Sequence, residues 1–183
     1  MTPGFVVWFT GLPAAGKSTI AGLVAEELER RGVLVDRLDG DVVRTHLSKG
    51  LGFSKEDRDT NIERIGWVAS RLARAGAVVV VSAISPYEEA RAKARALVEE
   101  QAPFVLVHVA TSVEECERRD PKGLYAKAHA GEIAGFTGVD DPYESPLDAE
   151  LSLDTEGRTP QASASLVVAR LAELGVLADE VAA

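Results

Sequence analysis

Residues 11–18 fit the pattern G-x-x-x-x-G-K-[ST], the phosphate-binding loop of proteins that bind nucleoside triphosphates. A β-prone apolar run over residues 5–10 leads into this loop, and a helical pattern over residues 20–28 leads out of it. The motif needs this order of strand, glycine loop and helix. Its context therefore favours a phosphate site over a glycine turn before a surface helix.

The chemistry of such a loop follows from its residue types. Glycines let the backbone curl so that successive N–H groups point at phosphate oxygens, and the next helix turns its positive end to the same anion. Lys17 can reach the β- and γ-phosphates, and the Ser18 hydroxyl can ligate Mg²⁺. The predicted ATP contacts are Gly11, Leu12, Pro13, Ala14, Ala15, Gly16, Lys17, Ser18 and Thr19.

Strand patterns alternate with helical patterns along the rest of the chain. The predicted strands are 5–10, 33–38, 77–82, 103–110 and, more weakly, 151–154. The predicted helices are 17–31, 54–75, 86–100, 112–119 and 160–174. Buried strands alternating with helices predict an α/β fold of three layers, with a mostly parallel sheet covered on both faces. The 183 residues suit one domain spanning 1–183.

Two segments depart from this alternation. Residues 120–147 are rich in glycine and proline, and a segment this long is usually a functional lid or a disordered linker. Its interleaved apolar side chains could dock on a surface, so we expect a lid. Residues 178–183 are expected to form a flexible tail.

The composition of the chain limits which classes of binding partner and which cellular compartment we expect. A net charge of −9 argues against nucleic acid or an anionic membrane as the main partner. No apolar run approaches the ~20 residues that cross a bilayer, and no secretory signal is apparent. Cys116 is the only cysteine, which suits a reducing cytoplasm, and the three histidines lack zinc-site spacing.

Two acids follow the second predicted strand. Asp39 and Asp41 flank Gly40, with Arg44 three residues further on. Ligands of open α/β sheets bind at the carboxyl ends of strands, so these carboxylates should face the phosphate loop. One could hold Mg²⁺ through water, while the other orients or deprotonates an attacking hydroxyl. The competing interpretation of Asp39 is a cap for the next helix.

A helix is predicted to start at Ser54, with Asp57 completing an N-capping arrangement. Arg58 and Asn61 then share one helix face. Arg58 could bind a phosphate or sulfate, and Asn61 could contact a base or ribose edge. Phe53 could stack on a base or act as a hydrophobic staple.

Other candidates carry two interpretations each. Ser85 could cap a helix that begins at Pro86, or it could contact substrate from the end of the third strand. Arg118 or Arg119 could reach ATP phosphates or stack on adenine, or both could belong to a salt-bridged helix end. The sequence contains no guanine-reading Asn-Lys-x-Asp, which favours ATP over GTP.

At this point the chain resembles the adenylyl-sulfate kinase family. The resemblance rests on Leu-Asp-Gly-Asp-x-x-Arg (38–44), Leu-Gly-Phe-Ser-x-x-Asp-Arg-x-x-Asn-Ile (51–62), Lys-Gly-Leu-Tyr (122–125) and Ala-Gly-Glu-Ile-x-Gly-Phe-Thr-Gly-Val-Asp-Asp-Pro-Tyr-Glu (130–144), besides the phosphate loop and Ile-Ser-Pro-Tyr (84–87). It implies transfer of the γ-phosphate of MgATP to the 3′-hydroxyl of adenosine 5′-phosphosulfate (APS). The product would be 3′-phosphoadenosine 5′-phosphosulfate (PAPS), used in sulfate assimilation.

The resemblance also implies residue roles. Asp39 orders Mg²⁺ waters, Asp41 faces the 3′-hydroxyl, and Arg118 or Arg119 lies beside ATP. The implied APS pocket comprises Asp41, Arg44, Phe53, Arg58, Asn61, Ile84, Ser85, Lys122, Gly135 and Phe136. A homodimer is implied too, and a separate ATP sulfurylase would supply the substrate.

Ser85 matches a serine that, in the family, is often assigned as the site of a phosphoserine intermediate. Phosphoryl transfer needs only alignment and charge stabilisation, and no neighbouring base is evident to activate Ser85. We therefore expect direct in-line transfer.

The sequence departs from the family pattern at the phosphate loop and beyond it. Pro13 removes one N–H, and Ala14 replaces a flexible glycine. At three positions where the family commonly has basic residues, this sequence has Ala126, His129 and Ala134. Two other functions are open on the residues alone: a kinase of another small-molecule or nucleoside hydroxyl, and a non-catalytic nucleotide-binding subunit.

Overall fold

A computed structural model describes residues 4–177, and the predicted tail at 178–183 lies outside these residues. In the described residues, five parallel strands form one sheet in the order β2-β3-β1-β4-β5. They are β1 (Phe5–Thr10), β2 (Val35–Asp39), β3 (Val78–Ser82), β4 (Phe104–Val109) and β5 (Leu151–Leu153). The parallel α/β prediction is therefore confirmed.

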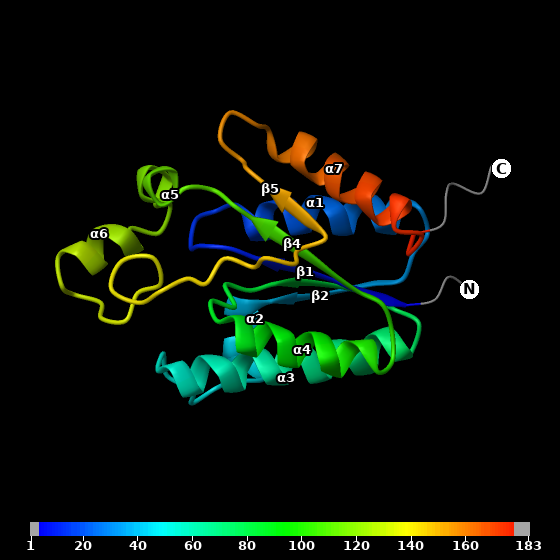
Figure 1. The fold of residues 1–183 in the computed structure, drawn as a ribbon, viewed down its shortest axis with the longest axis horizontal. Coiled ribbons are helices and arrows are strands. Elements are labelled where there is room, and N and C mark those ends of the chain that lie inside the picture. The colour runs from blue at the N-terminus through cyan, green and yellow to red at the C-terminus, as the bar shows by residue number, and fades with distance from the viewer. Residues whose placement is uncertain (1–3, 178–183) are drawn as a thin grey trace.

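Helices cover both faces of the sheet (Figure 1). On one face lie α1 (Lys17–Arg30) and α7 (Pro160–Glu173). The other face carries α2 (Gly40–His46), α3 (Lys55–Arg74) and α4 (Glu88–Glu99). Beyond the carboxyl ends of the strands stand α5 (Val113–Arg119) and α6 (Leu124–His129).

The apolar runs of the sequence become the central strands. Every residue of β1 and β3 is buried, because each strand has a neighbour on both sides and helices above and below. Successive β1 side chains enter different cores: Val7 packs under α1 and α7, and Trp8 packs under α3 and α4. In contrast, β2 lies at the edge of the sheet and is largely exposed.

Three local predictions need correction. Two short helices, α2 and α6, were not predicted, and α6 lies inside the irregular 120–147 segment. The fourth helix begins at Glu88 rather than at Pro86, and Ser85 does not cap it. Ser85 has a φ of +41°, which turns the chain away from the helix, and its hydroxyl faces Trp8 instead.

The parallel register brings the carboxyl ends of the strands to one edge. Thr10, Asp39 and Ser82 end β1, β2 and β3 there, beside the loop of residues 11–16. The α5 and α6 helices lie at the same end of the molecule (Figure 1). Parallel α/β sheets bind ligands at this end, and the candidate residues gather here.

Candidate active site

The phosphate loop ends on an unusual helix start. Gly16 is the N-cap of α1 with a φ of +104°, no side chain caps the helix, and its first turn carries no acid. The first N–H groups of a helix have no partners within it. The start of α1 therefore leaves N–H groups that could bind an anion.

Lys17 is folded back onto its own loop. Its Nζ donates to the carbonyl oxygens of Gly11, at 2.9 Å, and Leu12, at 2.7 Å. Burial lowers the pKa of Lys17 to about 8. The Lys17 ammonium is therefore a poorly solvated cation. Two loop carbonyls bind it, and a triphosphate could take their place.

Pro13 and Ala14 are the residues at which the phosphate loop departs from the family pattern. Ala14 has a φ of +62°, in the left-handed region that glycine adopts without cost. For alanine this conformation costs roughly 1–2 kcal/mol. The Tyr125 hydroxyl donates to the Pro13 carbonyl at 3.1 Å, which pins the loop from the 120–147 segment.

The loop and the first acid meet directly. Ser18 Oγ donates to Asp39 Oδ2 at 2.7 Å and lies 3.1 Å from Ser82 Oγ. The other oxygen of Asp39 accepts from the Asp41 N–H at 3.0 Å, so Asp39 also caps α2. The capping interpretation of Asp39 is therefore confirmed, and its second oxygen lies beside Ser18, where the interpretation as a Mg²⁺ contact remains a prediction.

Asp41 projects from the first turn of α2 into solvent. Its carboxylate pairs with Lys122 Nζ at 2.5 Å, which brings a predicted residue of the 120–147 segment onto a predicted residue of the strand end. The hydrogen bond from Lys122 to Asp41 raises the pKa of the lysine. Lys122 is therefore fully charged near neutral pH.

The second half of the site lies between α3 and the 120–147 segment. Ser54 caps α3 by accepting from the Asp57 N–H at 3.1 Å, as predicted. Arg58 is buried and donates to the Phe53 carbonyl, to Thr137 Oγ1 at 2.6 Å, and to the Gly135 carbonyl. This arginine ties the start of α3 to the segment.

Two neighbours of Arg58 are left open to a ligand. Phe53 is 65% exposed, and the Arg44 guanidinium lies 4.4 Å from its ring centre, so it is not a buried staple. Asn61 is 5% exposed, and its Oδ1 accepts no hydrogen bond from the described residues. A buried acceptor without a partner is costly, which suits a ligand-contacting residue.

Three further candidate residues near the site make contacts that hold the fold together: Ile84, Ser85 and Phe136. Ser85 Oγ accepts from Trp8 Nε1 at 3.1 Å and is buried. The Ile84 carbonyl accepts from Thr10 Oγ1 at 2.7 Å. The Phe136 ring packs edge-on against Tyr125, with ring centres 5.0 Å apart.

The structure separates the two arginine candidates. Arg119 Nη1 lies 3.4 Å from the Ala15 carbonyl, behind the phosphate loop. The Arg118 side chain is 73% exposed and pairs with Glu115. Hydrogen bonds from both arginines lower the pKa of Glu115 to about 2.

The sequence did not single out several residues that contact the site. They are Ser82, Thr111, Thr137, Asp141 and Thr155. Ser82 ends β3, while Thr111 and Thr155 each follow a strand by two residues. The strand-end rule could have indicated these three. Contacts of the others depend on how the 120–147 segment folds.

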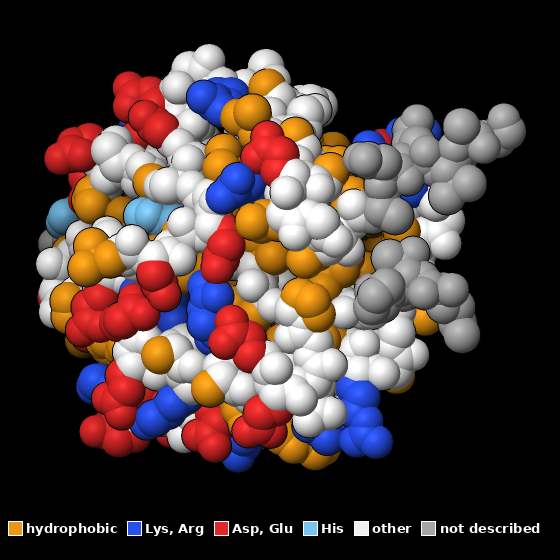
Figure 2. Space-filling view, turned by 45° about the vertical axis from the view of Figure 1, so that its right-hand side comes forward, with side chains coloured by type: hydrophobic (Ala, Val, Ile, Leu, Met, Phe, Trp, Pro, Cys, Tyr) orange, Lys and Arg blue, Asp and Glu red, His pale blue; other side chains and the backbone are white. Residues whose placement is uncertain are grey.

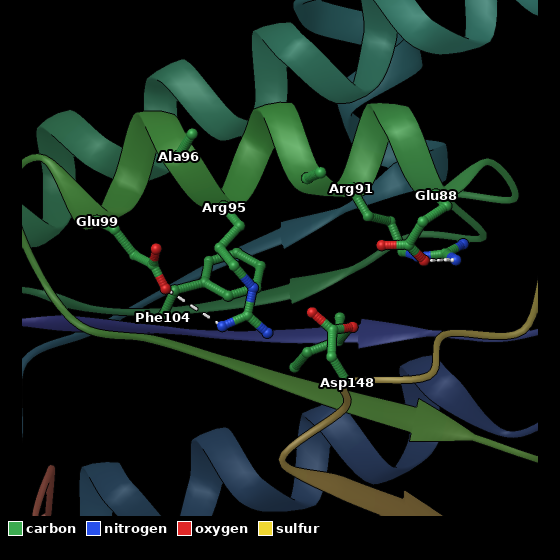
Figure 3. Close-up of a pocket in the computed structure, with 9 residues that line it drawn as sticks. Glu88, Arg91, Arg95, Ala96, Glu99, Phe104 and Asp148 are labelled. Atoms are coloured by element: carbon green, nitrogen blue, oxygen red, sulfur yellow. Dashed lines mark hydrogen bonds and ion pairs between the residues drawn. The ribbon is translucent and has the colours of Figure 1, made fainter.

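Two cavities flank this region. One of about 460 Å³ lies between Leu12, Val113 and residues 138–143 and 145 of the segment. The other, about 120 Å³, lies between α4, β4 and Asp148, with Arg95 and Glu99 bonded at 3.2 Å on its rim (Figure 3). The second cavity is lined by none of the predicted site residues.

Comparisons with known proteins agree with one another. A family model described as adenylylsulphate kinase matches residues 3–154. The adenylyl-sulfate kinase of Picosynechococcus sp. is 53% identical over 95% of this chain and 97% of its own. That of Chloroflexus aurantiacus is 58% identical over 84% of this chain and 81% of its own. The structure of an APS kinase from Mycobacterium tuberculosis, in complex with AMPPNP and APS, superposes with a TM-score of 0.91. It is 45% identical, covering 94% of this chain and 99% of that one.

Proposed function

Because this chain belongs to the adenylylsulphate kinase family, we propose that its phosphate loop and paired acids carry out the reaction of that family. The protein is an adenylyl-sulfate kinase that transfers the γ-phosphate of ATP to the 3′-hydroxyl of APS and forms PAPS. The observation that best supports the residue roles is the 2.7 Å contact between Ser18 and Asp39. It joins the loop to the strand end that carries Asp41.

Residues 11–19 bind the triphosphate. Lys17 exchanges its two loop carbonyls for phosphate oxygens, and the free N–H groups at the start of α1 bind the same anion. Arg119 supports the loop from behind. We assign Arg118 no contact with ATP because its side chain points into solvent.

Mg²⁺ fits the donor set at the loop. The described residues contain no cluster of three acidic, histidine or cysteine side chains that could hold a metal alone. Ser18 and Asp39 nevertheless place a hydroxyl and a carboxylate together, and Mg²⁺ in phosphoryl transfer keeps few protein ligands. When bound, Mg²⁺ would neutralise phosphate charge there.

APS binds between α3 and the 120–147 segment, which acts as a lid. Phe53 stacks on the adenine, Asn61 Oδ1 accepts from the nucleotide, and Arg44 and Lys122 supply positive charge. Arg58 orders Gly135 and Phe136 around the pocket. Ile84 and Ser85 complete its floor.

Asp41 accepts the proton of the 3′-hydroxyl as the oxygen attacks. The new bond joins the 3′-oxygen to the γ-phosphorus, the bond to the β-phosphate oxygen breaks, and ADP leaves. Asp41 must first part from Lys122. Transfer is direct in this proposal, because the buried Ser85 hydroxyl accepts from Trp8 Nε1 and donates to the Ala83 carbonyl, and no basic side chain among the described residues accepts its proton.

The decisive experiment is incubation with ATP, Mg²⁺ and APS, with identification of the product by mass. Asp41→Asn should bind ATP normally but lower kcat by about 10²–10⁴-fold, the range for a lost general base. Thr45→Ser, one helical turn away, is the matched control. Unaffected transfer by Asp41→Asn would remove Asp41 as the base, and a trapped phosphoserine would contradict direct transfer.

We also propose a homodimer, a separate ATP sulfurylase as source of APS, and a cytoplasmic location. The last is supported by a lone buried cysteine that suits a reducing compartment. No helix among residues 4–177 is long and apolar enough to span a bilayer. Sedimentation velocity tests the dimer, and a purely monomeric protein at micromolar concentration would contradict it.

A further inference from the structure

A chain of hydrogen bonds runs beneath the phosphate loop. Arg119 Nη1 donates to Thr155 Oγ1 at 2.9 Å, and Thr155 Oγ1 lies 2.6 Å from Thr111 Oγ1. Thr111 Oγ1 donates to the Ala15 carbonyl at 2.9 Å. The four residues come from α5, from the segments after β5 and β4, and from the loop itself.

The donors and the distances together indicate the direction of this hydrogen-bond chain. A guanidinium only donates, so Thr155 Oγ1 accepts from Arg119. The single hydrogen of Thr155 can go to Thr111 Oγ1 at 2.6 Å or to the Ala15 carbonyl at 3.4 Å, and the shorter contact favours Thr111. Thr111 in turn gives its hydrogen to Ala15, the shortest contact to that carbonyl. Longer contacts of 3.4 Å reach the same oxygen from Thr155 and Arg119. The hydrogen-bond chain therefore ends on the Ala15 carbonyl, with Thr111 as the donor in the shortest contact.

The surroundings strengthen the chain. Ala15, Thr111 and Thr155 are 0%, 4% and 6% exposed. Arg119 is held at its other side by Glu115, through Nε at 2.8 Å. Hydrogen bonds that follow one another in a low-dielectric interior polarise each other, so the cation draws electron density along the chain from the Ala15 carbonyl.

The consequence for ATP follows from peptide geometry. In a trans peptide the C=O and the next N–H point in opposite directions, and the described residues contain no cis bond. A carbonyl of Ala15 held inward therefore aims the Gly16 N–H outward. Drawing electron density from that carbonyl also makes the same N–H a stronger donor.

We propose that Thr111 and Thr155 are positioning residues for ATP, which fix and polarise the Ala15–Gly16 peptide so that its N–H donates to the triphosphate. The inference rests on the assignment of residues 11–19 as the triphosphate site. It adds two residues that touch neither substrate and act through the loop.

Thr155→Val and Thr111→Val remove a hydroxyl at nearly constant shape. Each should weaken ATP binding, measured by calorimetry, about fivefold or more, and should raise KM for ATP more than KM for APS. Thr155→Ser, which keeps the hydroxyl, should restore ATP affinity to within twofold. Ser165→Ala, which removes a hydroxyl on the outer side of α7, should leave both constants unchanged.

A readout without substrate separates positioning from general destabilisation. The ¹⁵N–¹H signal of Gly16 should move in Thr155→Val and return in Thr155→Ser. Unchanged ATP affinity and an unmoved Gly16 signal in folded Thr155→Val and Thr111→Val would overturn the proposal, and so would a serine variant as weak as the valine variant. Failure of the loop assignment looks different, because Lys17→Ala would then retain ATP binding.

Discussion

At the scale of single residues, the site is built from groups that already have partners. Lys17 bonds two loop carbonyls, Asp41 bonds Lys122, and Arg58 bonds the 120–147 segment. Each must exchange or keep these partners when substrates bind. Asn61 differs, because its buried Oδ1 accepts no hydrogen bond from the described residues.

The depressed pKa of Lys17 predicts a pH dependence of ATP binding. The ammonium binds phosphate and the neutral amine does not, so affinity should fall as pH rises through about 8. Calorimetry between pH 7 and 9 should show a loss approaching tenfold, one pKa unit being a tenfold change. Lys17→Ala should bind weakly with no such slope; a flat profile in the parent protein would contradict the idea.

The same group affects stability with the opposite sign. Its folded pKa of about 8 lies below the unfolded value of 10.5, so the unfolded chain binds more protons between these values. Stability from this group therefore rises with pH across that window. Below pH 8 both states are protonated, and the cost of burying the charge is fully present.

At the scale of elements, the start of α4 depends on a distant side chain. Tyr87 precedes the helix and offers no cap, while Glu144 Oε2 accepts from the Glu88 N–H at 2.6 Å. The Glu144 backbone binds the Pro86 carbonyl and Arg91, and Arg91 also binds the Ser85 carbonyl. The end of the 120–147 segment thus caps α4 and holds the Ser85 turn.

This arrangement predicts that Glu144→Ala destabilises the protein by about 0.5–2 kcal/mol, the usual cost of a lost cap. Urea denaturation measures the change. Glu144→Gln should lose less because an amide oxygen still accepts. The control is Glu89→Ala, which removes an exposed acid of the same helical turn, one that forms an ion pair with exposed Lys93. Equal stability of the two alanine variants would exclude the capping role.

Element prediction from sequence succeeded where the pattern was local. Strands β1 and β3 are continuous apolar runs, and Ser54 with Asp57 marks the start of α3. It failed at Ser85-Pro86, because the cap comes from 56 residues away and the serine adopts a positive φ. It also missed α2, which has only seven residues and two valines, a residue type that favours strands.

For the candidate site, the sequence indicated which residue types are present more fully than which residues contact one another. The loop motif and strand-end rule located Lys17, Ser18 and Asp39, whose positions follow from local geometry. They could not indicate that Arg58 binds Thr137 or that Thr155 supports Ala15. These contacts join parts of the chain that only tertiary folding brings together.

At the scale of the whole molecule, the two proposed substrate sites lie at the same end of the sheet, where the strands have their carboxyl ends. Acidic and basic side chains are interspersed on the face seen in Figure 2. ATP is expected against α1 and α5, while APS is expected between α3 and the 120–147 segment.

Ligand-linked stability should report the two sites separately. At 100-fold excess over Kd, each substrate stabilises the folded state by about 2.7 kcal/mol, which raises Tm by roughly 5–10 °C at this size. Thermal melts should show that Lys17→Ala loses the ATP shift and keeps the APS shift. Loss of both shifts in that variant would mean that the two sites are not independent.

One carboxylate oxygen of Asp39 accepts a hydrogen bond from Ser18, and the other accepts from the Asp41 N–H in the first turn of α2. A replacement here perturbs two structures at once, so lost turnover in an Asp39 variant cannot by itself be read as lost magnesium chemistry. Helix content and metal titration have to be followed in parallel. Two structural roles converge on this one side chain, and we expect it to tolerate fewer substitutions than Asp41, whose carboxylate is exposed and pairs with Lys122.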